Sequence, residues 1–374
     1  MSGESVKEIY IGLMSGTSAD AVDAVAAAFT DKKIELLGTK SDRLPNDVKV
    51  KIKSLSNSDP IEIDELATLD NKLGLLFAKT TKELLKSLGL ESDQVKAIGS
   101  HGQTIKHRPN DFMDGFSMQI GNASIIAIET GCKVVSDFRR ADIALGGHGA
   151  PLVPSFHYTY FGSSQVNRAI VNIGGIANIT LLPSNDSVSG YDIGPGNTLL
   201  DGWYKQHFNL EYDDKGIWAS TGEINEDFLS LLLTNKYFEK QPPKSTGPEE
   251  FCLNFLKQTL LDFRVKPEDV QATLTELTAI TITKSISNAQ PIDEVFVCGG
   301  GCKNTYLMER LLKNLRDFNQ PEPKSTSFLG IDPQWVEALT FAWMAKKRIH
   351  RETTNLPSVT GAKRKAVLGA VYCP

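Results

Sequence analysis

Apolar and polar positions near the start of the chain alternate in short segments, as they do in a series of strands. Apolar runs from Ile9 to Met14 and from Val22 to Phe29 flank the small polar segment Ser15–Ser18, and a charged turn separates the second run from Ile34–Gly38. The many alanines of the second run favour a helix by propensity alone. Because another strand-like segment follows directly, we predict a meander of three strands instead.

The rest of the first half alternates one long amphipathic segment with shorter elements. Apolar residues recur at helical spacing from Ile61 to Leu88, and Gly89 is well suited to end that helix. The buried strand Val95–Gly99 is expected to run into a small polar loop, Ser100–Thr104. The pattern further predicts a strand at Ser117–Ile120, a helix at Ala123–Thr130 capped by Asn122, and a strand at Lys133–Phe138.

The second half begins with the same layout as the first. Strands at Ala169–Ile173 and Ile176–Leu182 flank the turn Gly174–Gly175, and a later strand ends in the polar segment up to Asn304. Helices are predicted at Phe251–Phe263, Pro267–Asn288, Asn304–Leu315 and Pro333–Arg348. We therefore expect an α/β protein with two copies of one sheet-based unit.

A glycine-rich break at Gly146–Pro151 suggests where one unit gives way to the next. We place the first domain at residues 1–145 plus about 349–374, and the second at 146–348. The chain of 374 residues is long enough for two domains, each with its own core.

Composition narrows the functional classes. The net charge is −5, so no nucleic-acid partner is suggested, and no apolar run approaches the length of a membrane span. The five cysteines are few and odd in number, which indicates a reducing compartment. Cys298 and Cys302 have no second ligand pair nearby in the sequence, so they do not predict a zinc site. The N-terminus has no signal peptide, and we expect a cytoplasmic protein.

Several common phosphate and hydrolase signatures are absent, including the P-loop, the dinucleotide fingerprint and the G-x-S-x-G elbow. Three glycine-containing turns remain as candidates for holding phosphate: Ser15–Ser18, Asn172–Gly175 and Cys298–Gly301. Successive N–H groups in such turns, or at a helix start, bind anions. Each turn alone could equally be a plain tight turn, so the argument depends on all three together.

The first turn also brings hydroxyls and carboxylates together. Thr17 and Ser18 can donate hydrogen bonds, and Asp20 and Asp23 follow, where Mg²⁺ would accompany a phosphate.

A second candidate for chemistry is the segment from Gly190 to Asn197. Asp192 precedes a stiff Gly-Pro-Gly sequence, and Asn197 can cap the helix that begins near Thr198. Asp192 is either a local acceptor in a well-built turn or a carboxylate held in place to remove a proton from a nucleophile.

These segments together resemble one family. GLMSGTSADAVD, SHGQTIKHRP, QIGN, VVSDFRRADIALGGHGAPLVP, VNIGGIANIT, YDIGPGN, CGGGCKN and WVEALTFAW occur in this order from about Ile9 to Tyr372. The combination is similar to the anhydro-N-acetylmuramic acid kinases.

That resemblance implies the two-domain actin-like, ribonuclease-H-like fold shared by sugar kinases and heat-shock chaperones, with ATP and Mg²⁺ between the domains. It also implies the reaction. Water opens the 1,6-anhydro bridge of anhydro-N-acetylmuramic acid, and the freed 6-oxygen takes the γ-phosphoryl group, a step in cell-wall sugar recycling. A homodimer is a family-level expectation.

The family's functional positions fall on the following residues. Asp192 matches the catalytic base, and Glu337 matches an acidic residue near the sugar. Ser100, His101 and Arg139 or Arg140 match segments around the sugar pocket, where one arginine would suit the lactyl carboxylate; the arginines could also be a solvated surface pair. The ATP-binding segments match Gly16, Thr17, Ser18, Ala19, Asp20, Ala21, Val22, Asp23, Gly174, Gly175, Gly299, Gly300, Gly301 and Asn304, with Asp20 as the metal candidate.

One departure concerns the first turn. The family more often has Leu-Asp-Gly where this chain has Ala19-Asp20-Ala21, and Ala21 adopts positive φ less readily than glycine. The exact shape of this turn is therefore open.

Alternative functions also stay open. A levoglucosan-type kinase shares the fold and the reaction type, and an ordinary sugar kinase would phosphorylate an existing hydroxyl. A nucleotide-gated binding protein of the actin or chaperone type would turn over no sugar.

Overall fold

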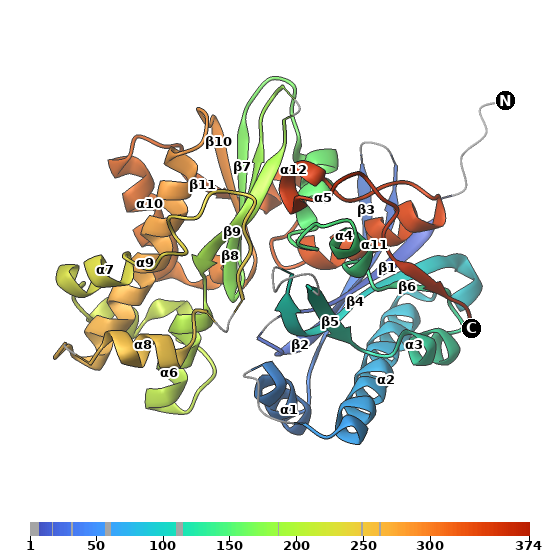
Figure 1. Ribbon diagram of the computed structural model, residues 1–374. Helices are drawn as coiled ribbons and strands as arrows, with labels where there is room; N and C mark the ends of the chain where they lie inside the picture. The colour runs from blue at the N-terminus through green and yellow to red at the C-terminus, as the bar shows by residue number, and fades with distance from the viewer. Residues whose placement is uncertain are drawn as a thin grey trace. The chain divides into compact units, whose positions relative to one another are not determined.

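Two mixed sheets organise the chain, one in each of two units (Figure 1). The computed structural model describes residues 7–16, 18–30, 33–56, 61–109, 115–185, 187–247, 250–261 and 263–374. Unit 1 consists of Met1–Tyr160 and Trp335–Pro374, and unit 2 of Phe161–Gln334.

The sheet of unit 1 has the strand order β12-β6-β4-β1-β2-β3, and β5 pairs with β4 beside this path. Strands β1, β2 and β3 form an antiparallel meander, while β4 runs parallel to β1 and β6 runs parallel to β4. The meander predicted from the sequence is thereby confirmed. The strands are β1 (Ile9–Ser15), β2 (Ala21–Phe29), β3 (Ile34–Arg43), β4 (Val95–Arg108), β5 (Phe116–Ile120), β6 (Val134–Ser136) and β12 (Ala370–Tyr372).

Unit 2 repeats this topology in the strand order β11-β10-β7-β8-β9. Strands β7, β8 and β9 form the antiparallel meander, β10 runs parallel to β7, and β11 runs parallel to β10. The strands are β7 (Arg168–Ile173), β8 (Ile176–Leu182), β9 (Ser189–Pro195), β10 (Glu294–Cys298) and β11 (Pro323–Ser325). The shared strand order confirms two copies of one α/β unit with the predicted ribonuclease-H-like arrangement.

Helices cover both faces of the sheet in unit 1. In Figure 1, α1 (Asn46–Ser56), α2 (Ile63–Leu88) and α3 (Ala123–Thr130) lie on one side of the sheet, and their apolar faces share one core with β1, β2 and β4. On the other side, α11 (Val336–Ile349) crosses β1 and β4.

Two glycines make this close crossing possible. Gly12 and Gly99 are partners in neighbouring strands, and a methyl group at either would overlap a carbonyl oxygen of α11, that of Ala338 or Phe341. The remaining helices of unit 1 are α4 (Arg140–Ala144), α5 (Val153–Phe161, at the unit boundary) and α12 (Pro357–Thr360).

Unit 2 has two apolar clusters. One joins the sheet to α9 and α10, and the other packs α6, α7 and α8 against α9. The helices are α6 (Thr198–Phe208), α7 (Glu226–Leu232), α8 (Leu253–Thr259), α9 (Pro267–Ser287) and α10 (Thr305–Asp317). Short 3₁₀ turns in the two units lie at Ser92–Gln94, Asp214–Gly216, Ala219–Thr221, Gly300–Lys303 and Thr326–Leu329.

The chain passes from unit 1 to unit 2 between Tyr160 and Phe161 and returns to unit 1 between Gln334 and Trp335. The boundaries predicted from the sequence were near 145 and 348. The reason is packing: α11 lies on β1, β2 and β4, so it joins unit 1 rather than unit 2.

Most local predictions are confirmed. The long helix ends at Gly89 in the left-handed region, and the Asn122 side chain accepts hydrogen bonds from the Ser124 and Ile125 amides as a cap. The predicted loop at Ser100–Thr104 is wrong, because β4 continues to Arg108 with backbone partners on β1 and then β5. Helix α8 is also shorter than predicted.

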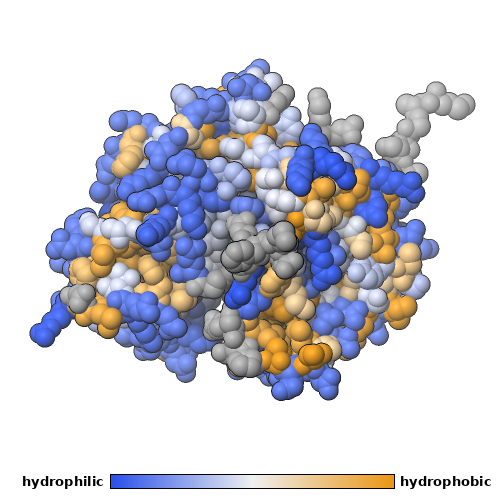
Figure 2. Space-filling view, in the orientation of Figure 1, coloured by the Kyte–Doolittle hydropathy of each residue, from blue (hydrophilic) through white to orange (hydrophobic). Residues whose placement is uncertain are grey.

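On the face seen in Figure 2, hydrophilic residues dominate and apolar patches are scattered. Among the described helices, none combines the length and the apolar character needed to cross a membrane.

Candidate functional site

The first candidate turn follows β1 in unit 1 and is held by a buried glutamine. Ser15 donates a hydrogen bond from Oγ to Gln103 Oε1 at 2.7 Å, and Gln103 Nε2 donates to the Gly16 carbonyl oxygen at 3.2 Å. The turn closes through the Ala19 amide, which donates to the Gly16 carbonyl at 3.0 Å. Because Ser15 and Gln103 are both buried, this support is shielded from water.

The backbone of this turn explains one glycine and one departure from the family pattern. An added Cβ at Gly16 would meet no atom of the described residues within 4 Å, and Gly16 is not among the glycines with positive φ. Nothing described in the chain itself therefore requires glycine at 16, and the space beside it is open. Positive φ occurs at Ala19 (φ 53°), whereas the sequence drew attention to Ala21, which begins β2.

The carboxylates after the turn have different surroundings. Asp20 Oδ1 forms an ion pair with Lys49 Nζ of α1, and the Asp20 carbonyl accepts from the Leu44 amide. Asp23 and Ala21 are half-buried within β2. Val22 lies between them, is buried and belongs to the core. Thr17 lies outside the described residues. No group of three or more His, Cys, Asp or Glu residues in the described parts of the chain is arranged to hold a metal ion.

His101 and Arg139 form one network in unit 1. Arg139 donates to His101 Nε2 from Nε at 3.1 Å and from Nη2 at 2.8 Å, and Arg139 Nη1 donates to the Gly149 carbonyl. His101 Nδ1 lies 2.9 Å from the Gly102 carbonyl, and its ring packs on Phe341 with centroids 4.6 Å apart. Burial, and then the Arg139 charge, hold the pKa of His101 well below its ordinary value, so this ring is neutral.

The other predicted residues near this network lie differently. Arg140 is exposed and has Asp137 3.6 Å away, which matches the solvated surface alternative. Ser100 is fully buried, and its Oγ has no hydrogen-bond partner among the described residues. Because successive strand residues face opposite sides, Ser100 points away from the α11 side, where His101 lies. Glu337 is half-buried in the first turn of α11.

Two further histidines, the half-buried His107 and the buried His157, share the depressed pKa of His101. Burial lowers the pKa of His107 and of His157 to about 3 each; at His107 the charges of Arg139 and His148 add to this effect. His107 Nδ1 lies 2.9 Å from Ser117 Oγ. All three rings are therefore neutral in the folded protein at ordinary pH.

The histidines predict a loss of stability in mild acid. Below pH 6.5 the unfolded chain binds protons at these rings and the folded chain does not, so the free energy of unfolding falls as pH falls. Each ring contributes up to about 1.4 kcal/mol per pH unit. Urea unfolding at pH 7.5, 6.5 and 5.5 measures this slope, and His107→Asn should make it shallower. Equal slopes for the variant and the unchanged protein would contradict the neutral state of His107.

The glycine turns of unit 2 form one connected structure at the end of β7. Amides at the start of α6 donate to the carbonyls of the hairpin turn. The Gly175 carbonyl accepts from the Gly196 amide at 2.9 Å and from the Thr198 amide at 3.1 Å, and the Gly174 carbonyl accepts from the Asn197 amide at 2.8 Å. The predicted side-chain cap by Asn197 is wrong, because its Nδ2 donates to the Ile173 carbonyl instead.

The turn after β10 adjoins the same strand end. Gly299 has φ 84°, and an added Cβ there would meet the Asn172 side chain and the Ile173 carbonyl; Gly301 packs against Ile173. Gly300 differs, since its nearest atom would be Asn197 Nδ2 at 4.0 Å. Asn304 caps α10 by accepting from the Leu307 amide. Gly300 thus faces open space beside the carboxyl ends of two parallel strands, where ligands commonly bind in such sheets.

Asp192 lies in β9 and is held from three directions. Its Oδ2 accepts from the Thr246 amide at 3.0 Å, its carbonyl accepts from the Tyr237 hydroxyl at 2.7 Å, and its amide donates to the Lys244 carbonyl at 3.3 Å. Only 7% of the residue is exposed. The carboxylate therefore has a fixed position, as the functional hypothesis requires.

Residues that the sequence left unassigned provide much of this support. Gln103 lies in a polar segment that was predicted as a loop, and Lys244 and Thr246 lie in a segment without regular secondary structure. Asp142, fully buried, accepts from the Gly149 amide, Asn355 Nδ2 and Thr360 Oγ1 at 2.8 Å each, and so anchors the loop beneath Arg139. The sequence signal for these residues was weak, because each acts on a partner far away along the chain.

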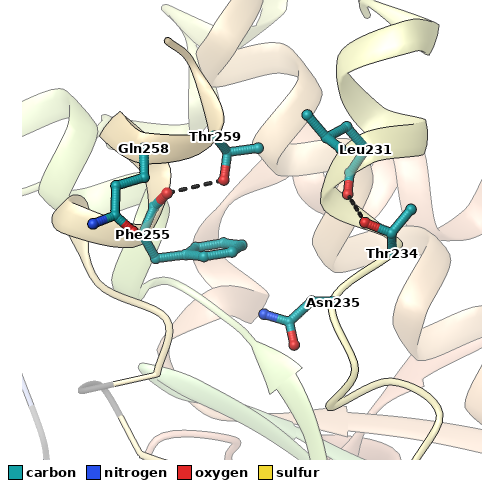
Figure 3. Close-up of a pocket in the computed structure, with 6 residues that line it drawn as sticks. All are labelled: Leu231, Thr234, Asn235, Phe255, Gln258 and Thr259. Atoms are coloured by element: carbon teal, nitrogen blue, oxygen red, sulfur yellow. Dashed lines mark hydrogen bonds between the residues drawn. The ribbon is translucent and has the colours of Figure 1, made fainter. Parts of the chain in front are cut away.

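A separate cavity lies in the helical part of unit 2. It has a volume of about 290 Å³ and is lined by six residues around the ends of α7 and α8 (Figure 3). Leu231 and Phe255 contribute apolar surface, and the hydroxyls of Thr234 and Thr259 donate to carbonyls of their own turns. None of the predicted site residues lines this cavity.

The comparison with known proteins decides the family. A sequence profile described as "Anhydro-N-acetylmuramic acid kinase" matches residues 8–374. The chain belongs to the anhydro-N-acetylmuramic acid kinase family. The family's named enzyme from Saccharophagus degradans is 45% identical over 370 residues, which cover 98% of this chain and 99% of the relative. That from Shewanella sediminis is 47% identical over 365 residues, covering 97% and 98%.

Solved structures outside this family are more distant. The activator of 2-hydroxyisocaproyl-CoA dehydratase from Clostridium difficile with bound ADPNP has 14% identity and a TM-score of 0.46, covering 93% of this chain and 99% of that one. A ROK-family glucokinase from Streptomyces griseus in complex with glucose and AMPPNP has 11% identity and a TM-score of 0.41, covering 91% and 99%. The assignment to the anhydro-N-acetylmuramic acid kinase family depends on the sequence relatives, and the fold on the strand order above.

Proposed function

We propose that this chain is an ATP-dependent kinase that opens the 1,6-anhydro bridge of anhydro-N-acetylmuramic acid and phosphorylates O6. The observation that carries the proposal is the full-length family match, with relatives of that name at 45% and 47% identity over nearly the whole chain. The product is N-acetylmuramic acid 6-phosphate, and the expected role is recycling of cell-wall sugar.

Asp192 is the proposed base. Its carboxylate takes a proton from a water molecule as the water oxygen bonds to the anomeric carbon. The bond from that carbon to O6 breaks, and its electron pair stays on O6, which attacks the γ-phosphorus while ADP leaves. The fixed position of the Asp192 carboxylate supports this role, because general-base catalysis requires a group held within reach of its proton.

The glycine turns are proposed to bind ATP. Gly16 and Gly300 have open space where a side chain would lie, which allows a phosphate or nucleoside to approach the backbone. Gly299 and Gly301 serve a different purpose, since a side chain at either would overlap the end of β7, and the Gly174 and Gly175 carbonyls accept from amides at the start of α6. In phosphoryl transfer such positioning and charge stabilisation account for most of the catalysis.

The surroundings of Asp20 do not fit a magnesium ion held mainly by the protein. Its carboxylate already faces the Lys49 ammonium, and no cluster of three acidic or other metal-binding side chains is present among the described residues. Mg²⁺ remains a proposed companion of ATP, held chiefly by phosphate and water oxygens, as is common for this ion.

Recognition of the sugar is proposed for unit 1. Arg139 is the stronger candidate for the lactyl carboxylate, because it is partly buried and oriented by His101, whereas Arg140 is solvated. Glu337 is the proposed acidic residue near the sugar. A role of Ser100 in binding the sugar is supported only by its position in the family segment. We also propose cytoplasmic location and a homodimer on family grounds; light scattering of the purified protein tests the dimer.

A coupled assay of ADP release tests the function. ADP release should depend on anhydro-N-acetylmuramic acid and be much slower with levoglucosan or with no sugar. In ¹⁸O water, label should enter at the anomeric carbon beyond an exchange control. Preference for levoglucosan would favour the related kinase, and no excess label would favour simple transfer to an existing hydroxyl. No ADP release with any sugar of a panel would favour a nucleotide-gated binding protein.

A further inference from the structure

A short segment of unit 2 runs beside the strand that carries Asp192. We call residues Lys244–Thr246 the strap. It makes a backbone bond from the Asp192 amide to the Lys244 carbonyl, and the Thr246 amide donates to the Asp192 carboxylate. Both ends of the strap therefore contact the same residue. The strap has no regular secondary structure of its own, so these bonds and its side chains hold it in place.

Lys244 supplies one side-chain attachment, and the Thr246 hydroxyl, which donates to Glu250 Oε2 at 2.9 Å, supplies another. Its ammonium lies 4.7 Å from the centre of the Tyr237 ring and 5.5 Å from that of Tyr191, and it donates to the Tyr237 carbonyl at 3.3 Å. Tyr237 is itself fixed, because its hydroxyl bonds the Asp192 carbonyl. A cation held between two aromatic rings is partly removed from water, where such contacts are strongest.

Charged groups of both signs surround Lys244. Lys240, Asp192 and Glu250 act on Lys244, and Asp192, Glu250 and Tyr191 act on Tyr237. Burial raises the pKa of Tyr237, with Asp192 and Glu250 adding to the effect, so the phenol stays neutral. Burial and Lys240 lower the pKa of Lys244, while Asp192 and Glu250 oppose this change. Lys244 is thus the partly buried cation of the cluster, whereas Lys240 is exposed.

We propose that Lys244 is a positioning residue for the reaction, which clamps the strap so that the Thr246 amide fixes the Asp192 carboxylate, and whose charge keeps that carboxylate ionised. The proposal rests on the proposed function, since it takes Asp192 to be the base. It assigns a purpose to a lysine in a segment without regular secondary structure.

The test is the pH dependence of kcat and kcat/KM for anhydro-sugar-dependent ADP release by the full chain. Lys244→Met keeps most of the apolar stem and removes the charge, Lys244→Arg keeps the charge, and Lys240→Met removes the neighbouring exposed cation from the same Tyr237 ring. The acid limb of the profile should move up by about one pH unit in Lys244→Met, which lowers the rate about tenfold on that limb. It should move little in Lys244→Arg and Lys240→Met, with KM for ATP unchanged throughout.

Other outcomes overturn the proposal. An unshifted profile in Lys244→Met, or an equal loss at every pH, would leave Lys244 with a structural role only or none. An equal shift in Lys240→Met would point to the general field of the loop. Thermal melts of each variant show whether it folds, and Lys244→Gln, which also removes the charge, decides the question if Lys244→Met does not fold. Asp192→Asn distinguishes a failure of the proposed function from a failure of the role proposed for Lys244. Full activity of Asp192→Asn would contradict the proposed function. An inactive Asp192→Asn together with an unshifted pH profile of Lys244→Met would contradict the role of Lys244 alone.

Discussion

Asp192→Asn is expected to lower kcat for anhydro-sugar-dependent ADP release by about 10² or more while leaving nucleotide binding in place. The asparagine has the same shape, and its amide oxygen can still accept the hydrogen bond from the Thr246 amide. It cannot take a proton from water. The measurement is kcat and KM by the coupled assay, together with nucleotide affinity by calorimetry.

The control for this variant is its fold. Because the backbone bonds of Asp192 to Tyr237 and Lys244 involve no side-chain atom of residue 192, Asp192→Asn should melt at nearly the same temperature as the unchanged protein. Normal turnover would show that another group removes the proton. A loss of nucleotide affinity alone would assign Asp192 to binding.

Gly12→Ala is expected to be among the most destabilising single methyl additions in unit 1. The new Cβ would overlap the Ala338 carbonyl oxygen and approach the Ala342 amide, both of them backbone atoms of α11. Adding atoms to a packed core typically costs about 1–3 kcal/mol when side chains can adjust. Here a helix must move, so we expect a loss at or above the upper end, measured by urea or thermal unfolding.

Gly16→Ala is the matched comparison, only four residues away. Its Cβ would meet no described atom within 4 Å, so stability should be nearly unchanged. If this space admits a phosphate, nucleotide affinity should fall about tenfold, the equivalent of one hydrogen bond. A stable Gly12→Ala protein would contradict the close crossing of α11. A Gly16→Ala protein with unchanged affinity for ATP would remove the first turn from the proposed site.

Local features of the sequence predicted local features of the structure well. Gly89, Asn122 and Asn304 stand at helix ends as expected, because a cap satisfies backbone groups only two to four residues away. The candidate turn residues also occur together within their own units: Gly174, Gly175 and Gly299–Gly301 at the end of β7, and His101 with Arg139 in unit 1. Ser100 and Arg140 do not join these groups.

The amino-acid sequence by itself determined the family, the repeat of one sheet-based unit and several helix ends, since these depend on motifs, periodicity and nearby hydrogen bonds. Only the tertiary structure decided that β4 continues through residues 100–104, because its partners on β1 and β5 lie elsewhere in the chain. Only the tertiary structure also showed that amides at the start of α6 donate to the carbonyls of the Gly174–Gly175 turn. The same is true of α11, which packs on Gly12 and Gly99 although it lies more than 230 residues away in the sequence. Such contacts pair groups whose separation along the chain carries no periodic signal, so they become visible only once the backbone has brought them together.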